Sequence, residues 1–184
     1  CVGDDRAYSF IPSRNGNTLS DIVANHVLKW TDANYVKYSW SDRGSDERQY
    51  CAPGIDLPVA SILRTKHGEY PEYHTSLDNL EDVVTPKGLD GGYWVLWRSI
   101  EALENNKNYK VTVLCEPQMG KRGLYPTLST KSSAKNIRLM RDFISFCDGK
   151  KSLLEIAEEL NVPIWDLYEI VKTLQNHNLV KVHK

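Results

Sequence analysis

Helical and strand patterns alternate along the first hundred residues of this chain. Residues 18–30 repeat apolar side chains at the spacing of an amphipathic helix, with Asn17 or Thr18 available as its cap. Residues 35–40 alternate and are rich in strand-forming side chains, and residues 57–64 form a short apolar run typical of a buried strand. Pro86 then precedes a second helical pattern that continues to Asn105. This order predicts an α/β layer architecture, in which sites gather in loops beyond the carboxyl ends of strands.

Residues 135–184 carry a denser helical pattern. Residues 136–149 and 152–161 each predict a helix, the second capped by Ser152, and a further helix is predicted from Pro163 to Asn178 before a strand at 179–184. Helices in this order, followed by a strand, are typical of a winged-helix domain. The periodicity predicts a core made of Leu139, Phe143, Leu153, Ile156, Leu160, Leu167, Val171 and Leu174.

Residues 108–134 mix Gly, Pro, Ser and Thr without a clear period, so we expect an irregular linker there. The predicted organisation is therefore an α/β domain at 1–107, a linker at 108–134 and a winged helix at 135–184. The chain begins at a cysteine, and we interpret "CVGDD" as the end of a strand whose beginning lies upstream.

Composition excludes some classes of function. A formal net charge of −1 provides no global attraction to nucleic acid or to anionic membranes. No apolar run reaches the roughly 18 residues that a membrane span requires, so we expect a soluble protein. The cysteines at positions 1, 51, 115 and 147 are widely spaced, which favours reduced thiols in a cytoplasmic protein over a zinc knuckle or a disulfide framework.

The segment "EYHTSLDNLEDV" at residues 72–83 places His74 at the head of a run of hydroxyls and carboxylates. Zinc in proteins is bound by imidazole and carboxylate groups whose orientation is fixed by further oxygen atoms. Asp78 and Asp82 are such carboxylates, although either could instead cap the next helix. The residues alone leave both interpretations of His74 open, a metal ligand or a surface histidine.

Residues 44–83, "GSDERQYCAPGIDLPVASILRTKHGEYPEYHTSLDNLEDV", resemble the closing portion of the co-catalytic zinc aminopeptidases, in which a "GSDH" loop, a strand and a "YHTPADTLD" loop follow one another. The segments "GDDRAYSFIPSRNGNTLSD" and "CEPQMGKRGLYPT" resemble an aminopeptidase-like subgroup named for polysaccharide biosynthesis, which adds a C-terminal winged helix. The resemblance implies the C-terminal portion of a three-layer α/β/α domain followed by a winged helix. It also implies zinc as the cofactor and His74 as a zinc ligand.

The same resemblance implies further site residues, with departures. Asp4 matches the family's acidic ligand only loosely, and Asp4 or Asp5 could instead be a turn residue after Gly3. The family's Ser-Asp-His is replaced here by Ser45-Asp46-Glu47, which puts the substrate preference in doubt. The family's first histidine, bridging aspartate, general-base glutamate and adjacent glutamate ligand are expected upstream and have no match in this chain. The residues expected to line the substrate site are Asp46, Glu47, Arg48 and Tyr50, with the His74 ring facing Asp46 across a cleft.

Other histidines have simpler roles in this interpretation. His67 precedes His74 by a spacing that suits a second metal, but a histidine beside a loop glycine is more often solvated. His26 lies on the apolar face of the first predicted helix and is most simply a core histidine bonded to a backbone carbonyl.

The leading hypothesis is part of a zinc-dependent hydrolase acting on a peptide or related amide. One alternative is a winged-helix transcriptional regulator with an enzyme-derived sensor domain, and another is a catalytically decayed structural or sugar-binding protein. Asp166 and Glu169 outnumber Lys172 on the predicted recognition helix, which argues against binding to DNA phosphates. We therefore expect the winged helix to pack on another domain, such as an upstream half, or on a second subunit.

Overall fold

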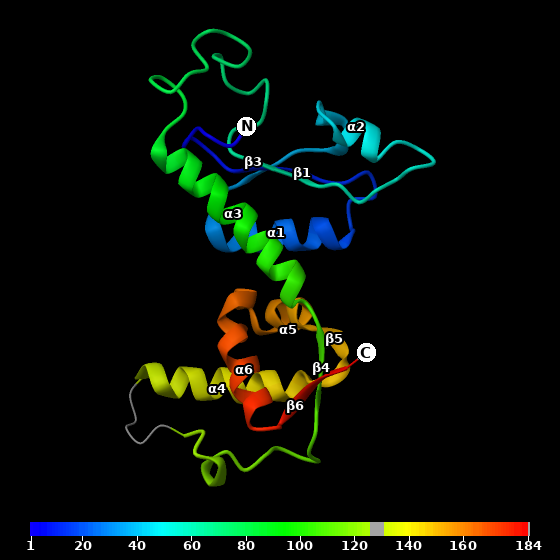
Figure 1. Ribbon diagram of the computed structural model, residues 1–184, viewed down its shortest axis with the longest axis vertical. Helices are drawn as coiled ribbons and strands as arrows, with labels where there is room; N and C mark the ends of the chain where they lie inside the picture. The colour runs from blue at the N-terminus through cyan, green and yellow to red at the C-terminus, as the bar shows by residue number, and fades with distance from the viewer. Residues whose placement is uncertain (126–130, 184) are drawn as a thin grey trace. The chain divides into compact units, whose positions relative to one another are not determined.

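The computed structural model describes residues 1–125 and 131–183, which divide into two compact units, Cys1–Glu101 and Ala102–Lys184 (Figure 1). The chain is of the α/β class, with a mixed sheet in the first unit and a winged-helix domain in the second. Among the described residues, no helix combines the length and the apolar character that crossing a bilayer requires.

The first unit is built on a sheet with the strand order β2-β1-β3, formed by Val36–Lys37, Ser9–Ile11 and Ser61–Leu63. The central strand β1 is parallel to β2 and antiparallel to β3, with Phe10 opposite both Lys37 and Ile62. β1 is buried along its whole length, whereas β3 is only half-buried. The sheet therefore depends on β1, which the sequence did not indicate.

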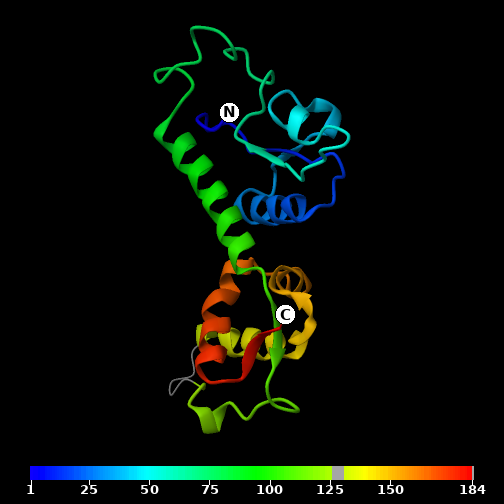
Figure 2. The ribbon, with the colours of Figure 1, turned by 45° about the vertical axis from the view of Figure 1, so that its right-hand side comes forward.

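Helix α1, Leu19–Thr31, connects β1 to β2 and lies along one face of this sheet in both Figure 1 and Figure 2. It buries Val23, Ala24, Val27 and Leu28. Its start is fixed by the buried carboxylate of Asp21, which accepts hydrogen bonds from the backbone N–H and hydroxyl of Ser13 at 2.7 and 2.5 Å and from those of Thr18 at 2.9 and 2.6 Å. One carboxylate thus joins the end of β1 to the start of the helix.

Short helices follow the next strand: η1 at Trp40–Asp42 and α2 at Glu47–Tyr50. Residues 1–5, which we expected to end a strand, have no strand structure. They are held by loop contacts, because the carbonyl of Cys1 accepts a hydrogen bond from the Arg64 backbone N–H at 2.8 Å.

Helix α3, Pro86–Asn105, has a small-residue face and an aromatic face. A Cβ atom added to Gly88 would lie 1.9 Å from the carbonyl oxygen of Gly3, so the helix approaches the first residues as closely as backbone allows. On the opposite side, large apolar side chains are substantially exposed, and the ring centroids of Tyr93 and Trp97 lie 6.2 Å apart in a stacked arrangement. The exposed set is Leu89, Tyr93, Trp94, Leu96, Trp97, Ile100 and Leu103.

The second unit contains a sheet with the order β5-β4-β6, formed by Asp148–Ser152, Asn108–Val111 and Val180–His183. Both pairings are antiparallel. The helices are α4 at Lys131–Phe146, α5 at Leu153–Leu160 and α6 at Tyr168–Asn176, with η2 at Gly120–Arg122 and η3 at Ile164–Leu167. Ser152 caps α5 by accepting a hydrogen bond from the Glu155 backbone N–H, as its position in the sequence predicted.

The predicted core of this unit is largely present. Phe143, Leu153, Ile156, Leu167, Val171 and Leu174 are buried, while Leu139 and Leu160 are half-buried. The predicted linker at 108–134 needs a correction, because its first residues form β4, the central strand of the sheet. The reason is that Asn108–Val111 pairs with distant segments on both sides, which a local pattern does not reveal. Part of the same prediction, residues 126–130, lies outside the described residues.

Replacing Asp21 with Asn should lower the free energy of unfolding at pH 7 by about 2 kcal/mol, because it weakens the hydrogen bonds that hold the start of α1. Burial alone raises the pKa of Asp21, but hydrogen bonds from Ser13 and Thr18 outweigh burial and leave the pKa below its ordinary value. The native carboxylate therefore stabilises the fold above a pH of about 4, and this stabilisation is lost as the pH falls through the lowered pKa.

Urea unfolding at pH 7 and pH 3 measures this difference. The variant should lose less stability on acidification than the native chain does, while Asp46→Asn at an exposed position should behave as the native chain. The same pH dependence in native protein and Asp21→Asn would contradict the assignment.

Replacing Gly88 with Ala should destabilise the protein by about 2 kcal/mol or more, because the new Cβ meets the Gly3 carbonyl. Helix propensity alone predicts the opposite, a gain of about 1 kcal/mol. Thermal unfolding of Gly88→Ala shows whether the steric cost or the gain in helix propensity is larger. The control is Lys87→Ala, a substitution at the exposed neighbouring position. A melting temperature for Gly88→Ala above that of the native chain would rule out the close backbone contact.

Candidate functional site

The loops that follow β2 and β3 meet in the first unit. Gly44 lies directly against His67, since a Cβ atom on Gly44 would be 2.4 Å from His67 Nε2. The ring centroid of His67 lies 6.1 Å from that of Tyr73, and the Tyr73 ring stacks on His74 at 4.0 Å. The turn at residues 44–47 and the loop at 67–74 are therefore connected through His67 and Tyr73.

His74 occupies an exposed position in this arrangement. Its backbone has a φ of 60°, in the left-handed region that histidine adopts more readily than most residues. It lies in the loop that follows β3, which ends at Leu63, and the cleft that we expected His74 to share with Asp46 stays a prediction. The imidazole that lies directly against the 44–47 turn is that of His67.

Glu47, which replaces the family's histidine, points into its own turn. It is 5% exposed and accepts hydrogen bonds from the backbone N–H groups of Gly44 at 2.7 Å and Ser45 at 3.0 Å. Burial raises the pKa of the Glu47 carboxyl, but backbone N–H groups of the turn and the nearby His67 together hold that pKa below its ordinary value. Glu47 is thus a negative charge that stabilises the turn beside His67.

His67 has the character of a partly buried, neutral imidazole. Burial lowers the pKa of His67 below its ordinary value, and the neighbouring Lys66 lowers it further, although Glu47 acts in the opposite direction. A neutral imidazole can accept a proton or bind a metal through one nitrogen. The sequence had marked this residue as more often solvated, because its packing against Gly44 depends on a distant loop.

The other residues expected to line the substrate site are exposed. Asp46 precedes helix α2 without capping it through its side chain, and Arg48 and Tyr50 lie on the outer surface of that short helix. The Arg48 side chain contacts the Ser45 carbonyl through Nε at 3.4 Å. The structure thus brings Glu47 towards His67, while Asp46, Arg48 and Tyr50 face solvent.

Asp4 is buried and its carboxylate already has partners. Oδ1 accepts hydrogen bonds from the Arg6 backbone N–H at 3.0 Å and the Thr65 hydroxyl at 2.5 Å, and Oδ2 accepts one from the Thr65 backbone N–H at 2.9 Å. This pattern favours the turn role that the sequence left open for Asp4 over the role of metal ligand.

Arg6 links this turn to the His74 loop, a contact that the sequence did not indicate. Its guanidinium donates two hydrogen bonds to the Glu72 carboxylate, at 2.8 and 2.9 Å. Beside it, the Tyr70 hydroxyl donates to Asp78 Oδ2 at 3.0 Å. Burial, followed by this hydrogen bond, raises the pKa of Tyr70 to about 12. Tyr70 therefore stays protonated and holds the loop on both sides of His74.

The described residues do not fit a complete zinc site. No group of three or more His, Cys, Asp or Glu side chains that could hold a metal ion occurs among them. Asp4, the second ligand that we expected, is engaged by Thr65 and by the Arg6 backbone. Of the expected ligands, His74 alone is exposed and accessible to a donor set completed from outside this chain.

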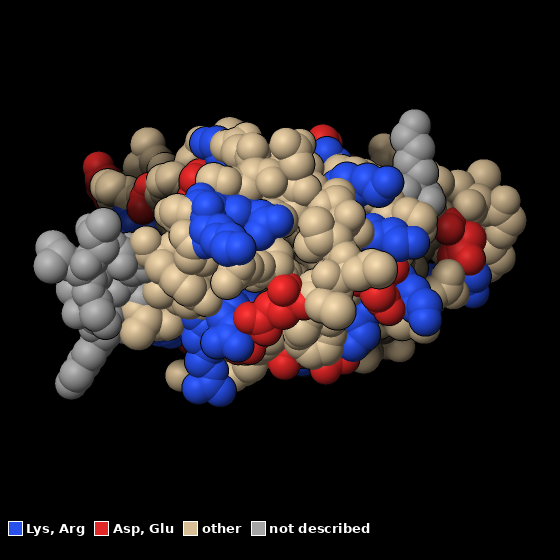
Figure 3. Space-filling view, turned by 90° about the horizontal axis from the view of Figure 1, so that it is seen from below, with Lys and Arg blue, Asp and Glu red and all other residues tan. Residues whose placement is uncertain are grey.

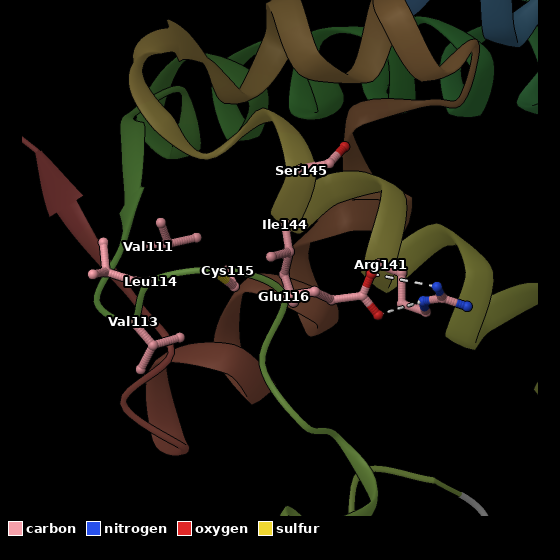
Figure 4. Close-up of a pocket in the computed structure, with 8 residues that line it drawn as sticks. All are labelled: Val111, Val113, Leu114, Cys115, Glu116, Arg141, Ile144 and Ser145. Atoms are coloured by element: carbon pink, nitrogen blue, oxygen red, sulfur yellow. Dashed lines mark hydrogen bonds and ion pairs between the residues drawn. The ribbon is translucent and has the colours of Figure 1, made fainter.

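A hollow of about 320 Å³ in the second unit involves the "CEPQMGKRGLYPT" segment (Figure 4). Val111, Val113 and Leu114 line one side of it, and Glu116 forms an ion pair with Arg141 on the other, at 2.8 Å. Because Glu116 and Arg141 pair with each other, this mostly apolar hollow presents no unpaired charge to orient a ligand.

Comparison with known proteins identifies relatives of both units. A family described as a domain of unknown function (DUF4910) matches residues 1–106, and a winged helix-turn-helix family matches residues 107–182. A Clostridium acetobutylicum protein named for polysaccharide biosynthesis and an aminopeptidase-like domain is 36% identical over 159 residues, which are 85% of this chain and 36% of the relative.

A solved structure shares the fold of both units. This crystal structure from Clostridium acetobutylicum, described as a candidate peptidase, matches with a TM-score of 0.85 and 32% sequence identity, over 99% of this chain and 40% of that one. The chain thus spans well under half the length of these relatives. The resemblance to aminopeptidase-like proteins with a winged helix is confirmed, whereas the zinc-dependent branch stays a prediction. The DUF4910 match covers residues 1–106, which are more than half of this chain. The chain therefore belongs to the family described as DUF4910 and continues into a winged helix-turn-helix domain.

Proposed function

We propose that this chain acts as the C-terminal part of a zinc-dependent, aminopeptidase-like hydrolase that cleaves a peptide or a related amide. The observation that carries the proposal is the similarity, over 99% of this chain, to a structure described as a candidate peptidase. The relative named for an aminopeptidase-like domain supports the same class of protein.

In this proposal, His74 contributes one imidazole ligand, and the remaining donors come from a longer protein in which this chain is embedded. The surrounding contacts suit such a role. Tyr73 stacks on the His74 ring, and the Arg6–Glu72 pair and the Tyr70–Asp78 hydrogen bond hold the loop on either side. Residues that fix a ligand's orientation are a regular part of zinc sites.

Glu47 and His67 complete the surroundings that we assign to the substrate. Because Glu47 is turned onto the backbone of its own turn, it does not directly replace the imidazole that the zinc aminopeptidases have at this position. His67, in contact with Gly44, brings an imidazole to the same turn from a different loop. We therefore place His67 beside the substrate, with Asp46, Arg48 and Tyr50 at the outer edge.

Replacing His74 with Ala in the longer protein should abolish stoichiometric zinc binding at one site, because a zinc site rarely tolerates the loss of one of its three or four ligands. Metal analysis after dialysis, together with calorimetric zinc titration, measures this effect. His177→Ala, at an exposed histidine of the winged helix, is the matched control and should retain the metal.

The 184-residue chain alone should bind zinc weakly, since the described residues contain no complete donor set. Tight stoichiometric zinc on this chain would mean that a local site, with His67 and His74 as its first ligands, has been overlooked. A longer protein that binds no zinc would refute the proposal and favour the alternative of a catalytically decayed structural or sugar-binding protein.

The winged helix is proposed to pack on protein and not to read DNA. On the described helix η3 and on α6, Asp166 and Glu169 face solvent, and the only lysine of α6, Lys172, is paired to Glu169 at 3.7 Å. Lys and Arg side chains are interspersed with Asp and Glu on the face drawn in Figure 3. An acidic recognition helix repels the phosphate backbone that supplies most non-specific affinity.

Fluorescence polarisation with a labelled duplex tests this role. The native chain should bind DNA with a Kd weaker than about 100 μM at physiological salt, the weak end of non-specific binding. The charge-reversed variant Asp166→Lys/Glu169→Lys should gain a salt-dependent affinity, which shows that the assay detects binding. Micromolar, salt-sensitive binding by the native chain would support the regulator alternative instead.

A further inference from the structure

A second cavity of about 320 Å³ lies within the first unit, and charged side chains of both signs line it. Its walls include Tyr8 and Gly91, and its charged residues are Asp5, Arg6, Asp32, Arg64, Lys87 and Asp90. A volume of this size is at the lower end of those that hold small molecules. Unlike the hollow beside Glu116 and Arg141, this cavity has charged groups that do not satisfy one another.

Arg64 forms the floor of the cavity. It is 4% exposed, its Nε donates to the Asp4 carbonyl at 2.7 Å, and its guanidinium carbon lies 3.7 Å from the centroid of the Tyr8 ring. The described part of the chain provides no hydrogen-bonding partner for its two terminal nitrogens. A buried guanidinium that is held in place and keeps two parallel donors unused suits bidentate binding of an oxyanion.

Gly91 lets the backbone of helix α3 lie directly against Tyr8 and Arg64. A Cβ atom at this position would lie 2.5 Å from the Tyr8 hydroxyl oxygen and 2.7 Å from Arg64 Nη1. Both polar atoms therefore lie against the helix backbone at Gly91, one of the three glycines of α3. A side chain at position 91 would overlap the Tyr8 hydroxyl and Arg64 Nη1 and so displace the guanidinium that lines the cavity.

The rim determines which kind of anion fits. Lys87, Asp90 and Asp5 are exposed around the opening, and within the described residues none of them forms an ion pair. Arg6 is already engaged by Glu72, which leaves Arg64 and Lys87 as the available cations. A multiply charged anion such as phosphate would be repelled by the aspartates, whereas a molecule with one negative and one positive group would satisfy both signs.

We propose that this cavity binds a small zwitterion, namely a free amino acid or a dipeptide. Its carboxylate accepts hydrogen bonds from the two terminal nitrogens of Arg64 and pairs with Lys87. Its protonated amine faces Asp90 and Asp5. This proposal does not depend on zinc or on hydrolysis, so it stands or falls separately from the proposed function.

Isothermal titration of the 184-residue chain with glycine, L-alanine and L-alanyl-L-alanine tests the proposal. At least one of these should bind with a Kd on the order of 1 mM, in the range expected for so few contacts. Acetate and methylamine, which each carry one of the two charges, should bind at least about tenfold more weakly, and so should inorganic phosphate. Failure of all three zwitterions to bind would overturn the proposal.

Variants at the rim separate binding from folding. Lys87→Gln and Asp90→Asn should each weaken zwitterion binding about fivefold or more without changing the melting temperature of the unliganded chain, because both residues are exposed. The matched controls are Lys110→Gln and Glu104→Gln, at exposed positions outside the cavity, and these should bind as the native chain does.

Gly91→Ala provides a steric test at the floor and should abolish binding. If zwitterion binding is unaffected by both rim variants and by Gly91→Ala, the ligand binds elsewhere and the proposal fails. If phosphate or acetate binds as tightly as the zwitterions, and Asp90→Asn strengthens that binding, the cavity is a simple anion site and the assignment to a zwitterion is wrong.

Discussion

The buried carboxylate of Asp4 is the contact on which the arrangement of the first unit depends. It holds the backbone N–H groups of Arg6 and Thr65, while the carbonyl of the same residue accepts from Arg64 Nε. One residue therefore fixes two arginines that point to different places, Arg6 towards Glu72 in the His74 loop and Arg64 towards the charged cavity. A buried carboxylate remains stable only when donors surround it, so these segments must be in place together.

Local signals explain why the helices were predictable. Thr18 and Ser152 mark helix starts through hydrogen bonds that span only a few residues, and apolar periodicity identified the buried faces of α5 and α6. The face of α1 was only partly predicted, because Val23 and Val27 of the apolar repeat are buried whereas Leu19 and Ile22 are exposed. Strands β1 and β4 were missed because each is short and becomes a strand only through its neighbours. Ser9–Ile11 pairs with segments near residues 36 and 62, and Asn108–Val111 pairs with segments near residues 150 and 182.

The candidate site shows the same division between local and distant information. The resemblance led to His74 and to the unusual glutamate at position 47, because both belong to continuous motifs. It did not indicate that Glu47 turns onto its own backbone or that His67 packs on Gly44, since those contacts join separate loops. For Asp4 the motif suggested too much. Its carboxylate was expected to bind a metal, but it accepts hydrogen bonds from Thr65, a residue of a distant loop that the local sequence does not connect to it.

The aromatic face of α3 gives this chain a built-in optical signal. Trp94 and Trp97 are 48% and 49% exposed, and the Trp97 ring stacks with that of Tyr93. Indole emission shifts to shorter wavelength when water is excluded from the ring, and soluble quenchers then lose access to it. Binding of any surface to this helix, whether from a longer chain or from another molecule, will therefore change the intrinsic fluorescence, so that it can be followed without any added label.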